Sequence, residues 1–259
     1  PSGWISESID TFSEEGPISK LRAYLLARRR LKQMNKHGQI DVPHIHVTHS
    51  ISWYRKRKMI RLCDQLGVKV VVHIHSGKFD SFCEGLAGRS VKKELGRNNR
   101  SVVVLENRWL GLLKKWIPSD TIVIPNFVKS RNSPKKRILS SGIRILMLSR
   151  DSNMKGHRFA LEIHEELKKR GRDVKMVFTG ISRNSKLRQF SGYEGVKMYD
   201  WVSEEEKISL LEEADFVLSP SSYEGSSITV IESIMGCVPC LCSPASAETI
   251  GVESLILER

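Results

Sequence analysis

The chain has 259 residues, of which 40% are hydrophobic and 27% charged, a composition that excludes a disordered or collagen-like protein and permits a buried core without disulfides. No apolar run approaches the roughly 18 residues that a membrane-spanning helix needs, which argues against an integral membrane protein. The net charge of +13 is unevenly distributed: residues 1–141 hold 27 Lys and Arg against 11 Asp and Glu, whereas residues 142–259 hold 15 against 18. The basic first part favours an anionic partner such as nucleic acid, lipid headgroups or an acidic small molecule. The alternative is a solvated basic face with no partner.

The first part of the chain alternates predicted helices with predicted strands. Residues 19–36 have the stripe of an amphipathic helix with a basic face that includes Arg28, Arg29 and Arg30. Short apolar runs predict strands at 45–47, 68–74, 102–105 and 121–124, with a helix at 59–66. Because strands and helices alternate, the sheet is expected to be parallel.

A basic, Ser-containing stretch over residues 130–142 carries Pro134 and is typical of a linker. The alternation then restarts, with strands predicted at 143–148, 175–178, 196–199, 216–218 and 238–242. Helices are predicted at 156–170, 185–190, 203–214 and 227–235, the third of them starting at a Ser203/Glu206 capping box. Two consecutive open α/β units, with ligand crevices at the carboxyl ends of their strands, are therefore expected.

The segment from Ser219 to Ser243 contains the strongest candidate site. It leaves a predicted buried strand, passes through Tyr223-Glu224-Gly225-Ser226-Ser227 and enters a helix, so backbone amides at the helix N-terminus face the crevice. These amides and the helix dipole favour an anion such as phosphate. Glu224 and Glu232 lie eight residues apart, and one carboxylate could meet each end of an elongated ligand. The alternative is that both are solvated helix glutamates.

These residues resemble the donor site of glycosyltransferase family 4, retaining enzymes of the GT-B fold that use nucleotide sugars. Ser149-Arg150 with Lys155-Gly156 resembles the start of that family's donor domain, and Glu248 fits its later Pro-Glu position. The resemblance implies two Rossmann-like domains whose parallel sheets face a central cleft. Residues 1–129 would form an incomplete acceptor-side domain, and residues 143–259 a donor-binding domain incomplete at its C-terminus.

The resemblance also implies roles for individual residues. Glu224 would contact the transferred sugar, Glu232 would bind the ribose hydroxyls, and the donor diphosphate would be held by Arg150, Lys155, Gly225, Ser226, Ser227 and Ile228. Two cations and a helix N-terminus converging on the leaving diphosphate could replace a divalent metal. No metal and no cofactor is therefore expected, and the donor would be a UDP-sugar or a GDP-sugar.

His73 and His75 follow a predicted strand and lie on one face of it. The resemblance matches His75 to a histidine beside the donor sugar and acceptor, which would make it a second catalytic residue with Glu224. Two alternatives remain, a metal site that also draws on His44, His46 or His49, and a pair of structural histidines. No Asp, Glu or Cys ligand set at metal spacing accompanies the histidines, which disfavours the metal.

Several positions depart from the family pattern. Ser149 replaces a glycine, Asp200 replaces the glycine expected near the nucleotide base, and Gly225-Ser226-Ser227 replaces Gly-Phe-Gly. The family's opening strand with its glycine-rich loop and its closing helices are also not visible. We therefore expect the chain to be a piece truncated at both ends.

The sequence predicts a retaining hexosyltransferase that acts on a glycan or lipid-linked acceptor hydroxyl, as in polysaccharide or lipopolysaccharide biosynthesis. The alternatives are an inactive GT-B protein that only binds nucleotide and a basic nucleic-acid-binding module, which the absence of any such signature disfavours. The five cysteines are an odd number and resemble no disulfide framework, which favours a reducing, cytoplasmic location. The basic first domain is expected to bind anionic lipid at the inner membrane face.

Overall fold

The computed structural model describes residues 3, 5–13, 15–128 and 142–257. The chain forms two compact units, Pro1–Ile124 and Pro125–Arg259. Apart from Gly142, the linker expected at 130–142 lies outside the described residues. None of the described helices combines the length and the apolar character that a bilayer crossing requires.

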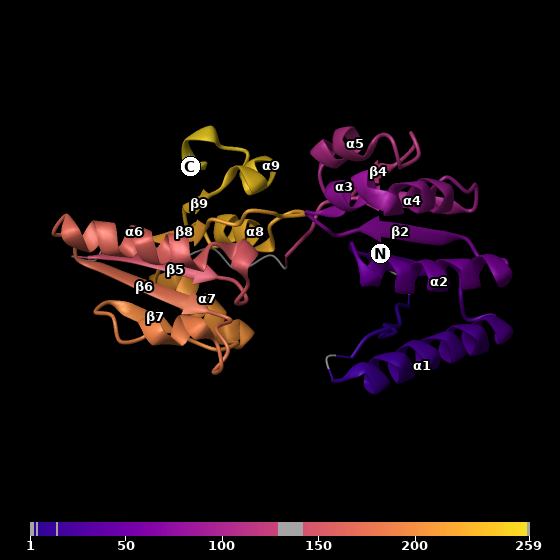
Figure 1. The fold of residues 1–259 in the computed structure, drawn as a ribbon, viewed down its shortest axis with the longest axis horizontal. Coiled ribbons are helices and arrows are strands. Elements are labelled where there is room, and N and C mark those ends of the chain that lie inside the picture. The colour runs from indigo at the N-terminus through magenta and orange to yellow at the C-terminus, as the bar shows by residue number, and fades with distance from the viewer. Residues whose placement is uncertain (1–2, 4, 14, 129–141, 258–259) are drawn as a thin grey trace. The chain divides into compact units, whose positions relative to one another are not determined.

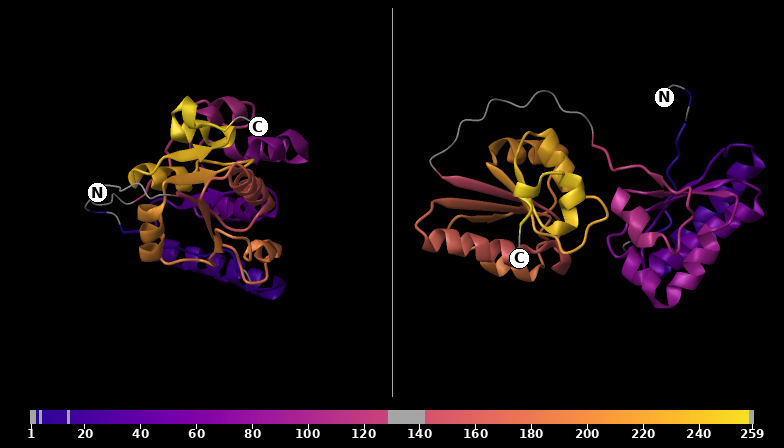
Figure 2. Two further views of the ribbon diagram at one scale, coloured as in Figure 1. Left: turned by 90° about the vertical axis from the view of Figure 1, so that its left-hand side faces the viewer. Right: turned by 90° about the horizontal axis from the view of Figure 1, so that it is seen from above.

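The N-terminal unit holds a four-stranded parallel sheet in the order β1-β2-β3-β4, formed by His44–Val47, Val70–Ile74, Arg100–Val104 and Ile122–Val123. Its helices are α1 (Pro17–Lys36), α2 (Ile51–Gln65), α3 (Phe79–Phe82), α4 (Gly88–Leu95) and α5 (Asn107–Leu113), with a π-helical turn at Cys83–Ala87 between α3 and α4. Because each strand pairs with the next one along the chain, right-handed crossovers place the connecting helices on one face. Figure 2 shows these helices on one side of the strands.

The two faces of this sheet differ in chemistry. On the helix side, alternate strand residues such as Ile45, Val72 and Val102 join Trp53 and Phe79 in one buried apolar cluster. On the other face, His44 and His46 of β1 are exposed, and the parallel register sets His46 beside His73 of β2. The sequence therefore places an apolar core on one side of the sheet and imidazole rings on the other.

A buried ion cluster ties α4 to β3 and α2. The side chains of Glu94 on α4 and Arg100 on β3 are both 0% exposed and lie 2.8 Å apart. Arg100 also reaches Asp64 of α2 at 2.5 Å, and Glu94 pairs with Arg61 at 2.8 Å. Charges this deeply buried are tolerated only when they are paired.

The C-terminal unit is a doubly wound α/β domain (Figure 1). Its parallel sheet has the order β7-β6-β5-β8-β9, formed by Val196–Met198, Val174–Thr179, Ile143–Leu148, Phe216–Ser219 and Cys240–Cys242. Helix α6 (His157–Lys169) contributes to the apolar cluster on one face of β5 and β6. The cluster on the other face includes residues of α7 (Glu204–Glu213), α8 (Ile228–Met235) and α9 (Ala247–Ile250).

The structure confirms the α/β class and the parallel sheets, and it corrects several elements. The helix expected at 59–66 begins at Ile51. Its first turns are rich in basic residues, but they also bury Trp53, so the apolar face of the helix extends further towards the N-terminus than predicted. The segment expected as a helix at 185–190 is a 3₁₀ helix, Lys186–Phe190. Helices α3, α4 and α5 were not predicted. The capping box at Ser203 and Glu206 is confirmed.

Candidate functional site

The candidate site lies where the strand order of the C-terminal unit reverses. Strand β5 is the first of this unit, and the chain proceeds from it to β6 on one side and later to β8 on the other. In sheets of this type, the crevice outside the carboxyl ends of two such strands, here β5 and β8, is the usual position of a ligand. The loop after β5 leads through a 3₁₀ turn, Asn153–Lys155, into α6, and the loop after β8 leads into α8.

A glycine brings these two loops together. Gly156 has φ +78°, and a Cβ atom at this position would lie 2.5 Å from the carbonyl oxygen of Pro220. The backbone N–H of Ser222 donates to the carbonyl oxygen of Met154 at 2.8 Å, which fixes the same junction. Only glycine combines this backbone conformation with so close an approach.

The junction places Lys155 beside Glu224. The Nζ atom of Lys155 lies 2.6 Å from Oε1 of Glu224, and the two side chains are 22% and 12% exposed. Two candidate residues that lie far apart in the sequence thus meet in one ion pair. A charge-assisted hydrogen bond of this length is among the stronger polar contacts in proteins.

The N-terminus of α8 follows directly after Glu224. Ser227 caps the helix by accepting a hydrogen bond from the backbone N–H of Val230, and Asn126 donates to the carbonyl oxygen of Ser226 at 3.0 Å. Thr229 ties the first turn to the end of β5 by donating to the carbonyl oxygen of Leu148 at 2.8 Å. The first backbone amides of α8 have no partner within the helix, so the end can bind an anion.

Glu232 lies one turn into α8 and is 8% exposed. Its Oε1 atom lies 2.6 Å from Nζ of Lys207 on α7, and Lys207 also contacts Glu204 at 2.8 Å. Burial alone would lower the pKa of Lys207, but its hydrogen bonds with Glu204 and Glu232 raise it above the ordinary value. Lys207 was missed by the sequence analysis, since no motif signals that it reaches a carboxylate 25 residues further on.

Arg150 follows β5 and is exposed; among the described residues it makes no ion pair. Its backbone is fixed from behind by Gly180, where a Cβ atom would lie 2.7 Å from the carbonyl oxygen of Ser149. The N–H of Asp151 donates to the carbonyl oxygen of Gly180 at 2.9 Å. Arg150 therefore has an exposed side chain that extends from a backbone held in place by Gly180.

Two of the positions that depart from the family pattern have local partners. The Oγ atom of Ser149 lies 3.1 Å from Nε2 of His157, a buried residue that the sequence analysis did not single out. The carbonyl oxygen of Asp200 accepts from Gly180 N–H at 3.1 Å, and its carboxylate accepts from the backbone N–H of Trp201 at 2.8 Å. Asp200 thus stabilises, through its carbonyl oxygen and its carboxylate, the turn at which the family has a glycine.

His75 belongs to the N-terminal unit, where it directly follows β2. Its Nε2 atom lies 2.7 Å from Nδ1 of His46. Burial, reinforced by the neighbouring histidines, lowers the pKa of His75 to about 3 and that of His73 to about 4. Both imidazoles are therefore neutral at physiological pH and resist protonation, but a ring nitrogen of each can accept a hydrogen bond.

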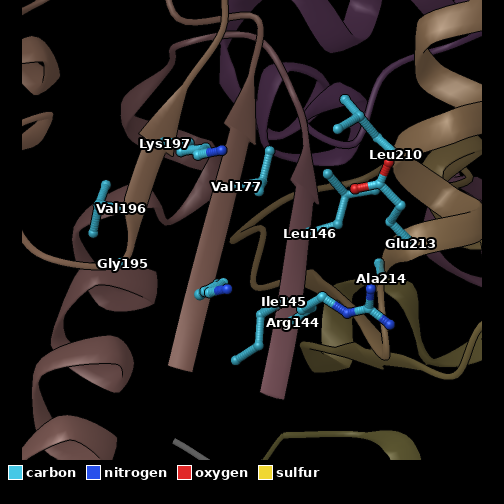
Figure 3. A pocket seen from close by; sticks show the side chains of 11 residues that line it. Arg144, Ile145, Leu146, Val177, Gly195, Val196, Lys197, Leu210, Glu213 and Ala214 are labelled. Atoms are coloured by element: carbon cyan, nitrogen blue, oxygen red, sulfur yellow. The ribbon is translucent and has the colours of Figure 1, made fainter. Parts of the chain in front are cut away.

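A separate cavity of about 480 Å³ lies near the amino ends of β5 and β6, away from the crevice. Figure 3 shows Arg144, Leu146, Val177 and Lys197 along its floor, with Glu213 of α7 beside it. None of the predicted site residues lines it. We therefore keep it apart from the candidate site.

The cysteines of this unit do not add a chemical site. Cys240 and Cys242 of β9 are buried, and burial raises the pKa of their thiols to about 12 and about 11. Protonated, buried thiols are poor nucleophiles and poor metal ligands. Both side chains are part of the apolar core of this unit.

Comparison with known proteins by sequence finds a match in the C-terminal unit. Residues 142–259 match the sequence profile of the family described as Glycosyl transferases group 1. No curated protein matches the chain by sequence.

Three solved structures illustrate the similarity of fold. TarM of S. aureus, in complex with fondaparinux, alpha-GlcNAc-glycerol and UDP, is 22% identical with a TM-score of 0.58, over 68% of this chain and 37% of TarM. HepE of Anabaena, in complex with UDP and glucose, is 13% identical with a TM-score of 0.67, over 92% of this chain and 67% of HepE. A glycosyltransferase from Rickettsia africae is 20% identical with a TM-score of 0.62, over 93% and 66%.

The chain spans about two fifths of the length of TarM. At these identities the structures establish the fold, which is the mixed α/β, parallel-sheet GT-B architecture. The profile match coincides with the unit that carries the Lys155–Glu224 pair and the α8 N-terminus. Residues 142–259 of this chain are thus similar in sequence to the group 1 glycosyl transferases.

Proposed function

We propose that this chain is part of a retaining, metal-independent glycosyltransferase that moves a hexose from a UDP-sugar or GDP-sugar to a hydroxyl group of a glycan or lipid-linked acceptor. The observation that carries the proposal is the Lys155–Glu224 ion pair at the N-terminus of α8, within the residues that match the family. The structures of TarM and HepE in complex with UDP support a uridine nucleotide as the first donor to test.

The chemistry of such a transfer matches the charges at this crevice. When the glycosidic bond breaks, negative charge develops on the diphosphate leaving group. Lys155, Arg150 and the amides of Gly225, Ser226, Ser227 and Ile228 would stabilise that charge without a divalent ion. In a low-dielectric crevice this stabilisation is worth more than in water.

The carboxylates would take different parts of the donor. Glu224 lies beside Lys155, so we assign it to the transferred sugar next to the diphosphate. Glu232 is held in place by Lys207, and its carboxylate would accept hydrogen bonds from the ribose hydroxyls. We assign a second catalytic role to His75 of the N-terminal unit, and acceptor binding to that unit.

Thermal unfolding against UDP, GDP, ADP and their sugars tests the donor assignment, because a ligand that binds only the native state raises its stability. We expect one nucleotide class to raise the Tm of the chain. Lys155→Met removes a charge-assisted contact worth about 1.5–3 kcal/mol and should weaken that nucleotide roughly 10- to 100-fold. Lys169→Met, which removes an exposed lysine on α6, is the matched control and should leave binding unchanged.

Sugar transfer separates the enzyme from its closest rival, a GT-B protein that only binds nucleotide. Glu224→Gln should abolish transfer and keep the nucleotide-induced rise in Tm, whereas Lys155→Met should lose both. The anomeric configuration of the product, read by NMR, tests retention. Nucleotide binding without transfer would favour the rival, and equal binding by Lys155→Met and the unmodified chain would refute the site. Steep salt-dependent binding to nucleic acid, insensitive to nucleotide sugars, would favour the nucleic-acid module.

Helix α1 supports the further proposal that the N-terminal unit associates with an anionic membrane surface at the cytoplasmic face. Leu21, Leu25 and Leu26 are more than half exposed and share a shallow groove with Arg22 and Arg29. An exposed apolar stripe beside basic residues is typical of helices that lie on anionic bilayers. Co-sedimentation with vesicles that contain phosphatidylglycerol should be lost in the double variant Leu21→Ser/Leu25→Ser, and retention by neutral vesicles would contradict the charge argument.

A further inference from the structure

The open face of the N-terminal sheet gathers four histidines on two adjacent strands. His44 and His46 alternate along β1, His73 lies on β2, and His75 follows it. The parallel register pairs His46 with His73, and because residues two apart share a face, all four rings lie on the same side. The sequence offered this grouping only as an alternative, because 26 residues lie between the two pairs.

The ring nitrogens are close enough to bind one ion. His44, His46 and His73 can each offer one nitrogen, with all three atoms within 4.8 Å of one another. The Nε2 atom of His44 lies 3.2 Å from Nδ1 of His73. Two nitrogens that bind the same tetrahedral ion at about 2.0–2.1 Å lie roughly 3.3 Å apart, so this pair needs almost no rearrangement.

The neighbouring groups also suit metal binding. His46 Nδ1 lies 2.7 Å from His75 Nε2, and this contact fixes the orientation of the His46 ring. His73 is 6% exposed, so the surrounding protein holds its ring in place.

We propose that His44, His46 and His73 form a binding site for one divalent transition-metal ion of the zinc, nickel or copper type on the open face of the N-terminal sheet. An all-imidazole set favours these ions over Mg²⁺ and Ca²⁺, which require oxygen ligands. The ion would link β1, at the edge of the sheet, to β2. This site lies in a different unit from Lys155 and Glu224, and it does not rest on the proposed transferase activity.

Metal titration of the full chain tests this site. The protein is prepared without a histidine tag and treated with EDTA. It carries Cys237→Ser, because Cys237 is the exposed thiol of the chain. Calorimetric titration with Zn²⁺ or Ni²⁺ should show one ion per chain, and Mg²⁺ should not bind. With Cu²⁺, the electron paramagnetic resonance spectrum should show nitrogen ligands.

Exposed members of the cluster provide the variants, since His73 is buried and its replacement could unfold the chain. His44→Gln and His46→Gln should each weaken Zn²⁺ binding at least tenfold and lower the metal-induced rise in Tm. His37→Gln, an exposed histidine at the end of α1, should change neither. Circular dichroism confirms that each variant is folded. Absence of saturable binding, or equal binding by the double variant His44→Gln/His46→Gln, would overturn the proposal.

Discussion

Replacing Gly156 by alanine should damage the C-terminal unit and its crevice together. At φ +78° a non-glycine residue costs about 1–2 kcal/mol of backbone strain. The new Cβ would lie 2.5 Å from the carbonyl oxygen of Pro220, so the loops after β5 and β8 must separate, and overpacking of this kind costs about 1–3 kcal/mol more. The unfolding free energy of this unit should therefore fall by about 2–5 kcal/mol.

Gly171 offers a matched control for this experiment. It has φ +71°, but nothing lies within 4 Å of its virtual Cβ atom, so Gly171→Ala should lose only the backbone contribution of about 1–2 kcal/mol. Differential scanning calorimetry measures both variants, and the nucleotide-induced rise in Tm should vanish in Gly156→Ala alone. Equal destabilisation by the two variants, with nucleotide binding intact in both, would refute the idea that this junction builds the crevice.

Three further predictions concern stability. Glu94→Gln leaves the buried Arg100 short of a partner and should lower the unfolding free energy by about 3–5 kcal/mol in urea denaturation; a change under 1 kcal/mol would contradict the pairing. Because burial lowers the pKa of His73 from its ordinary 6.5 to about 4, the folded state resists protonation that the unfolded state accepts, so about 3 kcal/mol of stability should be lost as pH falls from 6.5 towards 4. The urea midpoint should fall along this slope, and an unchanged midpoint between pH 6.5 and pH 4 would contradict the burial of the His73 ring. Ser203→Ala removes the cap of α7 and should cost about 1 kcal/mol of unfolding free energy, whereas Ser191→Ala, outside any α-helix, should cost less.

Local patterns in the sequence were enough to predict the order of strands and helices in the C-terminal unit. Each strand there is a short apolar run with clear breakers, and Ser203 with Glu206 marks a helix start that the structure confirms. Helices α3 to α5 escaped prediction because they are short and hold their apolar residues through contacts with the sheet. Their helical periodicity extends over too few turns to be recognised.

The residues of the candidate site were also predicted only in part. The context after a strand end indicated Glu224, the family resemblance indicated Lys155, and the structure brings the two side chains within 2.6 Å. Lys207 could not be predicted, since its contact with Glu232 depends on how α7 packs beside α8. The grouping of His44 with His73 depends on strand register, which the sequence does not reveal until the neighbouring strands are known.

The Lys155–Glu224 pair has a consequence for which anions the crevice can admit. Chloride or acetate approaching Lys155 would replace a partner of the same charge, so the exchange offers little gain and leaves Glu224 without its cation. A ligand with several negative charges can contact Lys155, Arg150 and the α8 amides at once and outweigh that loss. At Lys155, the resting ion pair thus favours ligands with several negative charges over monovalent anions.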